Sequence, residues 1–471
     1  MSRKGELAKN TAILTFGKIC TQFISFLLLP LYTAILQPAD YGAFDLLTTY
    51  ATLLLPLINW QFDQGVFRYM LEYREDKEQQ RKIFSTIFTV HIIQSLAFIA
   101  IMSLINIIHE IPHISFLILY VTVQVFVALF LQFIRGLGKN VAYAVASFIS
   151  AVSTVLLNIL TLVVLKLGLS GLFISSIIAQ VITLVYMIFV TKPWNYFEIK
   201  LYSKKEFKKV SSFSLPLIPN NLAWWIVGLS DRTIISHVLN VSMNGIYTVA
   251  NKFSNVFIQF YNVFNLSWTE TVTLHYLDDD RDEFLSETMT SIYKLFSCSC
   301  LGIVALMPFV FPLLVDKKYS EAYPQIIILM YAMLLRVLVG LYSCIYIATK
   351  ESKKIAYTSA VSAVINIIVN LLFIKSIGLY AASISTVVAF GSMLIVRYID
   401  INKTIHMRIK TSVLVSSLSL ALVLAVTYFL NFFWINFIML LVITVYSILM
   451  NIGLFKSGII IVKNYFKKFM M

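Results

Sequence analysis

The chain has 471 residues, of which 59% are hydrophobic and only 13% are charged. A mean hydropathy of +0.83 means more apolar surface than a soluble domain buries in one core, so the composition excludes a soluble protein and indicates an integral membrane protein. The formal net charge of +14 would suit a nucleic-acid-binding protein, but in a membrane protein basic residues first report orientation.

Fourteen apolar stretches are long enough to cross a bilayer, which takes about 20 helical residues. They lie near 10–36, 46–67, 83–107, 114–134, 141–165, 172–191, 213–236, 244–269, 292–315, 325–349, 355–374, 379–396, 413–430 and 437–455. Because they are rich in aliphatic residues without alternating polarity, they predict helices rather than barrel strands. We therefore expect an all-α integral membrane protein with 14 transmembrane helices.

The first stretch is too long for a signal-peptide core and has no small-residue cleavage site after it, so we expect a retained span. The four cysteines all fall inside predicted spans without the spacing of a metal site: Cys20, Cys298, Cys300 and Cys344. We interpret them as buried apolar side chains. The loops are short, which argues against an enzyme with a separate catalytic domain.

Basic residues sort strongly between the two faces. If the fourteen spans alternate, 27 of the 37 lysines and arginines fall on the face that carries both termini. Arg397 and Lys403 belong to that group. The opposite face carries only Lys166, Lys317, Lys318 and Lys375. The positive-inside rule therefore predicts cytoplasmic termini.

Two sequence pairs indicate an internal repeat. SAVS occurs at 150–153 and at 359–362, and LQPADYGAF at 36–44 aligns with LNVSMNGIY at 239–247, at offsets of 209 and 203. We expect two pseudo-symmetric six-helix lobes, 1–200 with helices 1–6 and 201–400 with helices 7–12. Residues 401–471 would add helices 13–14 and a cytoplasmic tail. Six helices per lobe gives both lobes one orientation and places a cavity between them.

The stretch WWIVGLSDRTIISH, 224–237, carries Asp231 and Arg232 within an apolar run. Charges at membrane depth usually face a bundle interior or an aqueous cavity. Arg232 lies about 6 Å from the external end of its span, so snorkelling to the headgroups is one reading. Lys252 lies about 12 Å inside the next span, where either a pair with Asp231 or a place in the cavity wall would account for it.

Two further bases lie deep without a carboxylate in their own helix, Lys18 and Arg336. Set against the deep acids Asp63 and Asp231, the four bases leave the interior with surplus positive charge, which favours an anionic cargo. Candidate substrate-binding residues are therefore Arg232, Lys252, Arg336 and Lys18, and candidates for ion coupling or charge pairing are Asp231 and Asp63. The prolines of LPLIPNN, Pro216 and Pro219, mark a hinge or a packing kink. No catalytic residue, cofactor or metal site is predicted, and the acidic run at 278–283 is interpreted as a solvated loop.

Several short motifs lie along the chain: LPLIP at 215–219, Asp231-Arg232, Gly245-Ile246-Tyr247, Lys252 and Trp268, with Pro30-Leu31 and Tyr41-Gly42. Together they resemble those of the polysaccharide and O-antigen flippases of the Wzx type, in the multidrug/oligosaccharidyl-lipid/polysaccharide exporter superfamily. The resemblance implies a protein of the bacterial inner membrane. It would flip an undecaprenyl-pyrophosphate-linked oligosaccharide outward by alternating access, with basic residues around the cargo. Polysaccharide assembly proteins and membrane lipids are the implied partners, and nucleic acid is not.

Two alternatives stay open from the residues alone: a drug or cation antiporter of the same superfamily, and a membrane-embedded polysaccharide polymerase or ligase. A cavity lined by carboxylates would favour the first. With a negative cytoplasm, moving one negative charge outward gains about 2.3 kcal/mol per 100 mV, so the membrane potential would assist an anionic cargo. Coupling to H+ or Na+ is a further expectation.

Overall fold

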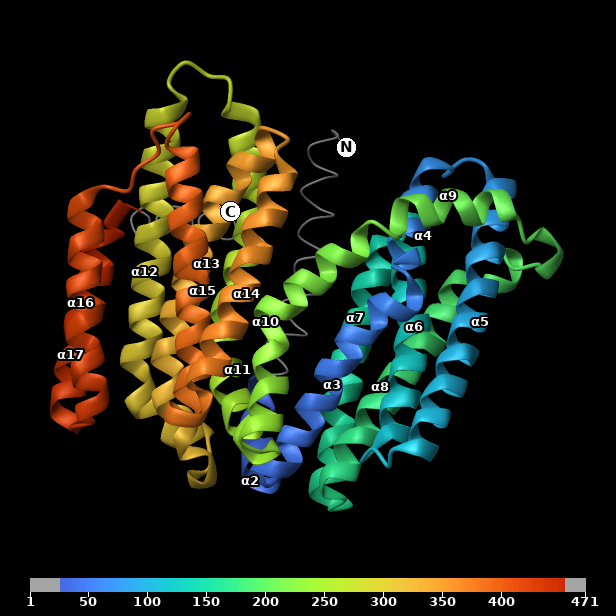
Figure 1. Ribbon diagram of the computed structural model, residues 1–471, viewed down its shortest axis with the longest axis horizontal. Helices are drawn as coiled ribbons and strands as arrows, with labels where there is room; N and C mark the ends of the chain where they lie inside the picture. The colour runs from blue at the N-terminus through green and yellow to red at the C-terminus, as the bar shows by residue number, and fades with distance from the viewer. Residues whose placement is uncertain (1–25, 454–471) are drawn as a thin grey trace, which may run out of the picture. The chain divides into compact units, whose positions relative to one another are not determined.

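The computed structural model describes residues 26–453, and within that range the chain forms helices and no strand (Figure 1). It divides into two compact units, the first ending at Thr248 and the second beginning at Val249. The first unit contains α2 (Leu29–Ile35), α3 (Pro38–Asn59), α4 (Phe62–Glu72), α5 (Lys77–Ile108), α6 (Ile114–Gly136), α7 (Asn140–Asn158), the π-helix η1 (Ile159–Val164), α8 (Gly168–Thr191), the 3-10 turns η2 (Pro193–Asn195) and η3 (Ile199–Leu201), α9 (Lys204–Ser214), α10 (Leu217–Val238) and the start of α11 (Val241–His275).

The second unit continues α11 and adds six helices and one 3-10 turn. These are α12 (Arg281–Leu314), η4 (Lys317–Ala322), α13 (Tyr323–Ala348), α14 (Ser352–Ile377), α15 (Leu379–Ile401), α16 (Thr411–Leu430) and α17 (Phe433–Met450). The expectation of two lobes bounded at 200 and 400 stays a prediction.

Eleven helices in residues 26–453 are long and apolar enough to cross a membrane. They match eleven of the fourteen predicted stretches and confirm a multi-pass helical membrane protein. The predicted spans at 213–236 and 244–269 correspond to α10 and α11, which are long enough but too polar to count by composition. Most of the stretch 10–36 lies outside the described residues, so the total of fourteen stays a prediction.

An aromatic cluster forms one end of the first unit, between α5, α6 and the loop before α9. The Phe84 and Phe133 rings stack with centroids 4.3 Å apart, and Tyr196 meets Phe133 edge-on at 5.2 Å. The Ser85 hydroxyl donates to the Tyr196 carbonyl (2.9 Å) and accepts from the Glu198 amide (3.0 Å). These two hydrogen bonds give partners to backbone groups of the loop, which would otherwise be buried without a hydrogen bond.

Two glycines bring the starts of α3 and α11 into backbone contact. Each lies four residues after the first residue of its helix, Gly42 after Pro38 and Gly245 after Val241. A Cβ on Gly42 would lie 2.0 Å from the Val241 carbonyl oxygen, and a Cβ on Gly245 would lie 2.0 Å from the Pro38 carbonyl oxygen. The contact is thus reciprocal, and the two glycines are separated by the same 203 residues that align 36–44 with 239–247.

Small side chains let α13, α14 and α15 pack closely in the second unit. The Ser383 hydroxyl donates to Gln325 (2.7 Å) and the Ser362 hydroxyl donates to the Ala389 carbonyl (2.7 Å), all four residues being buried. Helices in lipid associate through such small residues and interhelical hydrogen bonds. The described cysteines, Cys298, Cys300 and Cys344, are free and buried as expected, and Cys20 lies outside the described residues.

Candidate functional site

Arg232, predicted to face a cargo, is paired with an acid in the same unit. Its Nε lies 2.8 Å from Asp45 Oδ2 of α3, and both side chains are largely buried. The guanidinium also donates to the Gly228 carbonyl (3.4 Å). Snorkelling therefore does not describe Arg232, whose charge is compensated by Asp45 inside the packed helices.

The predicted second span begins at 46, so Asp45 is not among the predicted deep acids. The helix begins earlier, at Pro38, because Gln37 is extended and proline favours the first position of a helix. Asp45 therefore lies two turns inside α3. The largely buried acids of the first unit therefore include Asp45 as well as Asp63 and Asp231.

Further hydrogen bonds attach α10 to α3. The Trp225 indole Nε1 donates to the Thr49 carbonyl at 3.1 Å, and the Asn221 amide donates to Gln61 Oε1 at 3.0 Å, where α3 ends. Together with the ion pair between Arg232 and Asp45, these contacts are made at residues 221, 225 and 232, so they are spread along the length of α10. The two helices form one packed element.

Asp231, next to Arg232, is also buried and accepts a hydrogen bond from the Tyr247 hydroxyl at 3.1 Å. Tyr247 lies in α11, two residues after Gly245. The hydrogen bond from Tyr247 to Asp231 therefore connects α10 to the beginning of α11 within the first unit. The alternative pairing of Asp231 with Lys252 stays a prediction.

Asp63 lies at a break in the predicted second span. Trp60 and Gln61 adopt left-handed backbone conformations, with φ of 52° and 56°, which end α3 and start α4. The buried Asp63 carboxylate accepts one hydrogen bond from the Asn59 amide (3.1 Å) and one from the Gln64 amide (2.8 Å). No basic side chain forms an ion pair with it in the described part of the chain, and its assignment to ion coupling or charge pairing stays a prediction.

The two prolines predicted as a hinge lie at the α9–α10 junction. Pro216 caps α10 and Pro219 is its third residue. Because the first four amides of a helix have no helical acceptor, Pro219 removes no hydrogen bond there, and the expected interruption of the helix lies before Leu217 instead. Their role as a hinge stays a prediction.

Two predicted substrate-binding residues lie in the second unit. Arg336, near the middle of α13, is half-buried, with its guanidinium carbon 5.9 Å from the centroid of the Phe390 ring. Lys252 is half-buried in α11. Lys18 lies outside the described residues. The assignment of these three to a cargo stays a prediction.

Arg397 is a buried cation just beyond the end of a predicted span. The predicted span ends at 396, but α15 continues to Ile401 and encloses Arg397 with no exposed surface. The guanidinium donates to Thr358 Oγ1 (2.9 Å), the Val339 carbonyl (3.3 Å), Ser359 Oγ (3.3 Å) and Ser343 Oγ. All its acceptors among the described residues are neutral, so Arg397 joins α13, α14 and α15 without an ion pair.

Known structures share this fold. A lipid II flippase, MurJ, in an inward closed conformation superimposes with a TM-score of 0.68, at 16% sequence identity, over 94% of this chain and 99% of that chain. A multidrug resistance MATE transporter of the MOP superfamily in an inward-facing conformation matches with a TM-score of 0.67, at 14% identity, over 81% of this chain and 95% of that one. At such identities the likeness shows the fold alone.

The sequence comparison identifies the family. No curated protein matches the chain. A family model described as "Polysaccharide biosynthesis protein" matches residues 7–268, which is more than half of the chain. The expected family is therefore confirmed: the protein belongs to the polysaccharide biosynthesis protein family, and its fold is shared with these two solved structures.

Proposed function

We propose that this protein flips undecaprenyl-pyrophosphate-linked oligosaccharide units from the cytoplasmic to the external leaflet of the bacterial inner membrane. The carrying observation is the match to a lipid II flippase over 94% of this chain, in a member of a polysaccharide biosynthesis family. A lipid-linked saccharide cargo satisfies both findings. Alternating access of the two halves is the mechanism proposed with it.

In this proposal the anionic pyrophosphate is recognised by Lys252 and Arg336, with Lys18 as a further candidate. Arginine and lysine form charge-assisted hydrogen bonds to phosphate oxygens, and Arg336 supplies a fork suited to two of them. Arg232 has a different part, since its charge is compensated by Asp45 and it attaches α10 to α3. Outward movement of the anionic cargo would be assisted by a membrane potential that is negative inside.

The experiment measures flipping of a fluorescent undecaprenyl-pyrophosphate-oligosaccharide in proteoliposomes containing the whole chain. Arg336→Ala should lower the initial rate at least tenfold, because one charge-assisted contact to phosphate is worth about 1.5–3 kcal/mol. Lys375→Ala removes the same charge from an exposed position and should keep the rate. Equal rates for wild type and Arg336→Ala would refute the assigned site.

A drug or cation antiporter is the second candidate, favoured by the equally good fold match to a MATE transporter. The buried Asp63, held by two neutral amides, would suit proton exchange in such a protein. Drug efflux from cells expressing the chain, with no flipping of the lipid-linked saccharide, would select this function and reject the flippase.

A further inference from the structure

The segment between α8 and α10 lies at one end of the first unit. α8 is a candidate membrane span of 24 residues, about 36 Å long, so Thr191 at its end reaches the headgroup level of a bilayer. The η2–η3 loop and α9 follow directly. In Figure 1, α9 runs across the end of the unit, whereas α5, α6 and α8 run along it. The segment therefore lies at the surface of the membrane rather than inside it.

Contacts with the first turns of α5 fix the loop at this level. Arg81 forms an ion pair with Glu198 (2.8 Å), and the Ser203 amide donates to Thr86 Oγ1 (3.0 Å). The apolar part of α5 begins at 83, between these two contacts, so they mark the boundary of the bilayer. The loop is therefore held at the edge of the bilayer.

The loop exposes large apolar side chains at this boundary. Trp194 is 59% exposed, Ile199 66% and Tyr202 46%, although none of them belongs to a membrane-spanning helix. Phe197, in contrast, packs inward, with its ring centroid 5.1 Å from that of Phe88. Exposing so much apolar surface to water is unfavourable, and tryptophan and tyrosine concentrate at membrane–water interfaces. The exposed side of the loop is thus suited to contact with lipid.

The helix that follows presents a basic face. Glu206 and Val210, one turn apart, are buried against the rest of the first unit, whereas Lys204 and Lys208 are exposed. Residues four apart are neighbours on a helix surface, so these two lysines lie side by side and point away from the buried face. The whole segment 192–214 contains six lysines and two glutamates, which leaves a net charge of +4. A positively charged face therefore adjoins the apolar loop.

We propose that residues 192–208 form a surface that binds anionic phospholipids, with Trp194 and Ile199 among the headgroups and the lysines of α9 attracting negative charge in the same leaflet. Such attraction extends over a Debye length, about 8 Å at physiological ionic strength, so the lysines need not converge on one phosphate. A zwitterionic lipid would match only the apolar loop, and a soluble acidic partner only the lysines. An anionic phospholipid matches both. The proposal does not depend on the identity of the transported cargo, because none of these residues is assigned to it.

Fluorescence quenching of the whole chain in vesicles tests this, with phosphatidylglycerol or phosphatidylethanolamine whose acyl chains are brominated near the headgroup. The difference between each protein and its Trp194→Phe variant isolates Trp194 among the six tryptophans. Both lipids should quench Trp194, and phosphatidylglycerol should do so at a lower mole fraction. Lys204→Gln/Lys208→Gln should reduce this preference at least fivefold, because one lysine near an anionic surface is worth roughly fivefold in binding.

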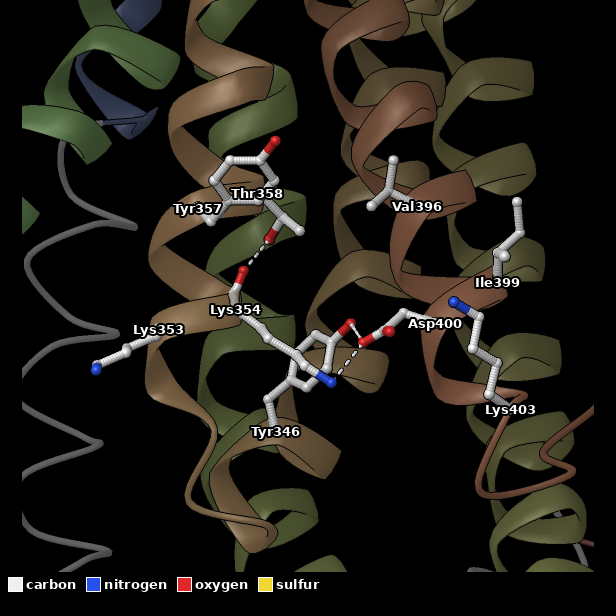
Figure 2. A pocket seen from close by; sticks show the side chains of 9 residues that line it. All are labelled: Tyr346, Lys353, Lys354, Tyr357, Thr358, Val396, Ile399, Asp400 and Lys403. Carbon is white, nitrogen blue, oxygen red and sulfur yellow. Dashed lines mark hydrogen bonds and ion pairs between the residues drawn. The ribbon is translucent and has the colours of Figure 1, made fainter.

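The matched control is Lys353→Gln/Lys403→Gln, which removes the same charge from exposed lysines of the second unit. Figure 2 shows these two lysines pointing apart, on either side of the ion pair between Lys354 and Asp400. The control should leave the preference at Trp194 unchanged. Quenching of Trp194 by neither lipid would place the loop outside the bilayer, and equal quenching by both would remove the preference for negative charge. Either result would overturn the proposal, as would an equal loss of preference in the control.

Discussion

The glycine contact between α3 and α11 makes a quantitative prediction for Gly245→Ala. The new methyl group would lie 2.0 Å from the Pro38 carbonyl oxygen, whereas a carbon and an oxygen in contact need about 3.2–3.4 Å. The backbones must therefore separate by more than about 1 Å. They are also tied there, because the Asn244 side-chain amide donates to the Gly42 carbonyl at 3.0 Å.

Overpacking of this kind costs about 1–3 kcal/mol, and a clash between two backbones, which cannot change rotamer, belongs at the upper end. Alanine also favours a helix over glycine by about 1 kcal/mol, which would mask part of the loss. Gly302→Ala is the matched control, since a Cβ there meets nothing within 4 Å and the same helical gain applies. The difference between the two variants isolates the contact.

The assay is thermal unfolding of the purified protein in detergent. Gly245→Ala should unfold several degrees below Gly302→Ala, at about 2–4 °C per kcal/mol. Because the contact is reciprocal, Gly42→Ala should cost as much as Gly245→Ala. The double variant should cost less than the sum of the two, since the contact is lost only once. Identical melting of Gly245→Ala and Gly302→Ala would show that the two backbones do not touch.

Three other predictions concern charged groups. Asp45→Asn and Arg232→Gln should each lower the free energy of unfolding by about 3–5 kcal/mol, and the double variant by less than their sum; additive losses in a double-mutant cycle would exclude the ion pair. Arg397→Lys should lower the melting temperature more than Arg397→Met, because lysine keeps a buried charge but loses the planar fork of the guanidinium. The expected losses in the free energy of unfolding are about 2–3 kcal/mol for Arg397→Lys and about 1 kcal/mol for Arg397→Met; the reverse order would mean that charge itself stabilises the site. Asp63→Asn should change stability by only about 1 kcal/mol while removing any proton dependence of transport in proteoliposomes with an imposed pH gradient; an unchanged dependence would place coupling elsewhere.

The helical membrane architecture could be predicted from the sequence because it depends on composition and length, which hydropathy reports directly. The pairing of Gly42 with Gly245 was also within reach, since the two positions correspond in the aligned segments 36–44 and 239–247. What hydropathy does not report is where a helix begins or ends relative to its apolar part. Asp45 and Arg397 both lie in helical turns beyond the apolar stretch, so hydropathy does not show that their side chains are enclosed by packed helices.

The break at Trp60 and Gln61 illustrates a second limit. Left-handed conformations are usually marked by glycine or asparagine, and neither residue gives that signal. Tertiary packing imposes the break, and the Asn221 amide bound to Gln61 is part of that packing. Asp63 was identified as a deep acid from its sequence position, but its place at a helix start, held by Asn59 and Gln64, required the structure.

The charges inside the helices separate into those that stabilise packing and those proposed to bind cargo. Arg232 has a carboxylate at 2.8 Å and Arg397 has neutral acceptors from three helices, so both have specific partners in the packed units. Because Arg232 is paired with Asp45, we assign the phosphate contacts of the proposed function to Lys252 and Arg336. Loss of stability is therefore the expected phenotype of Arg232 variants, and loss of transport at normal stability is that of Arg336 variants.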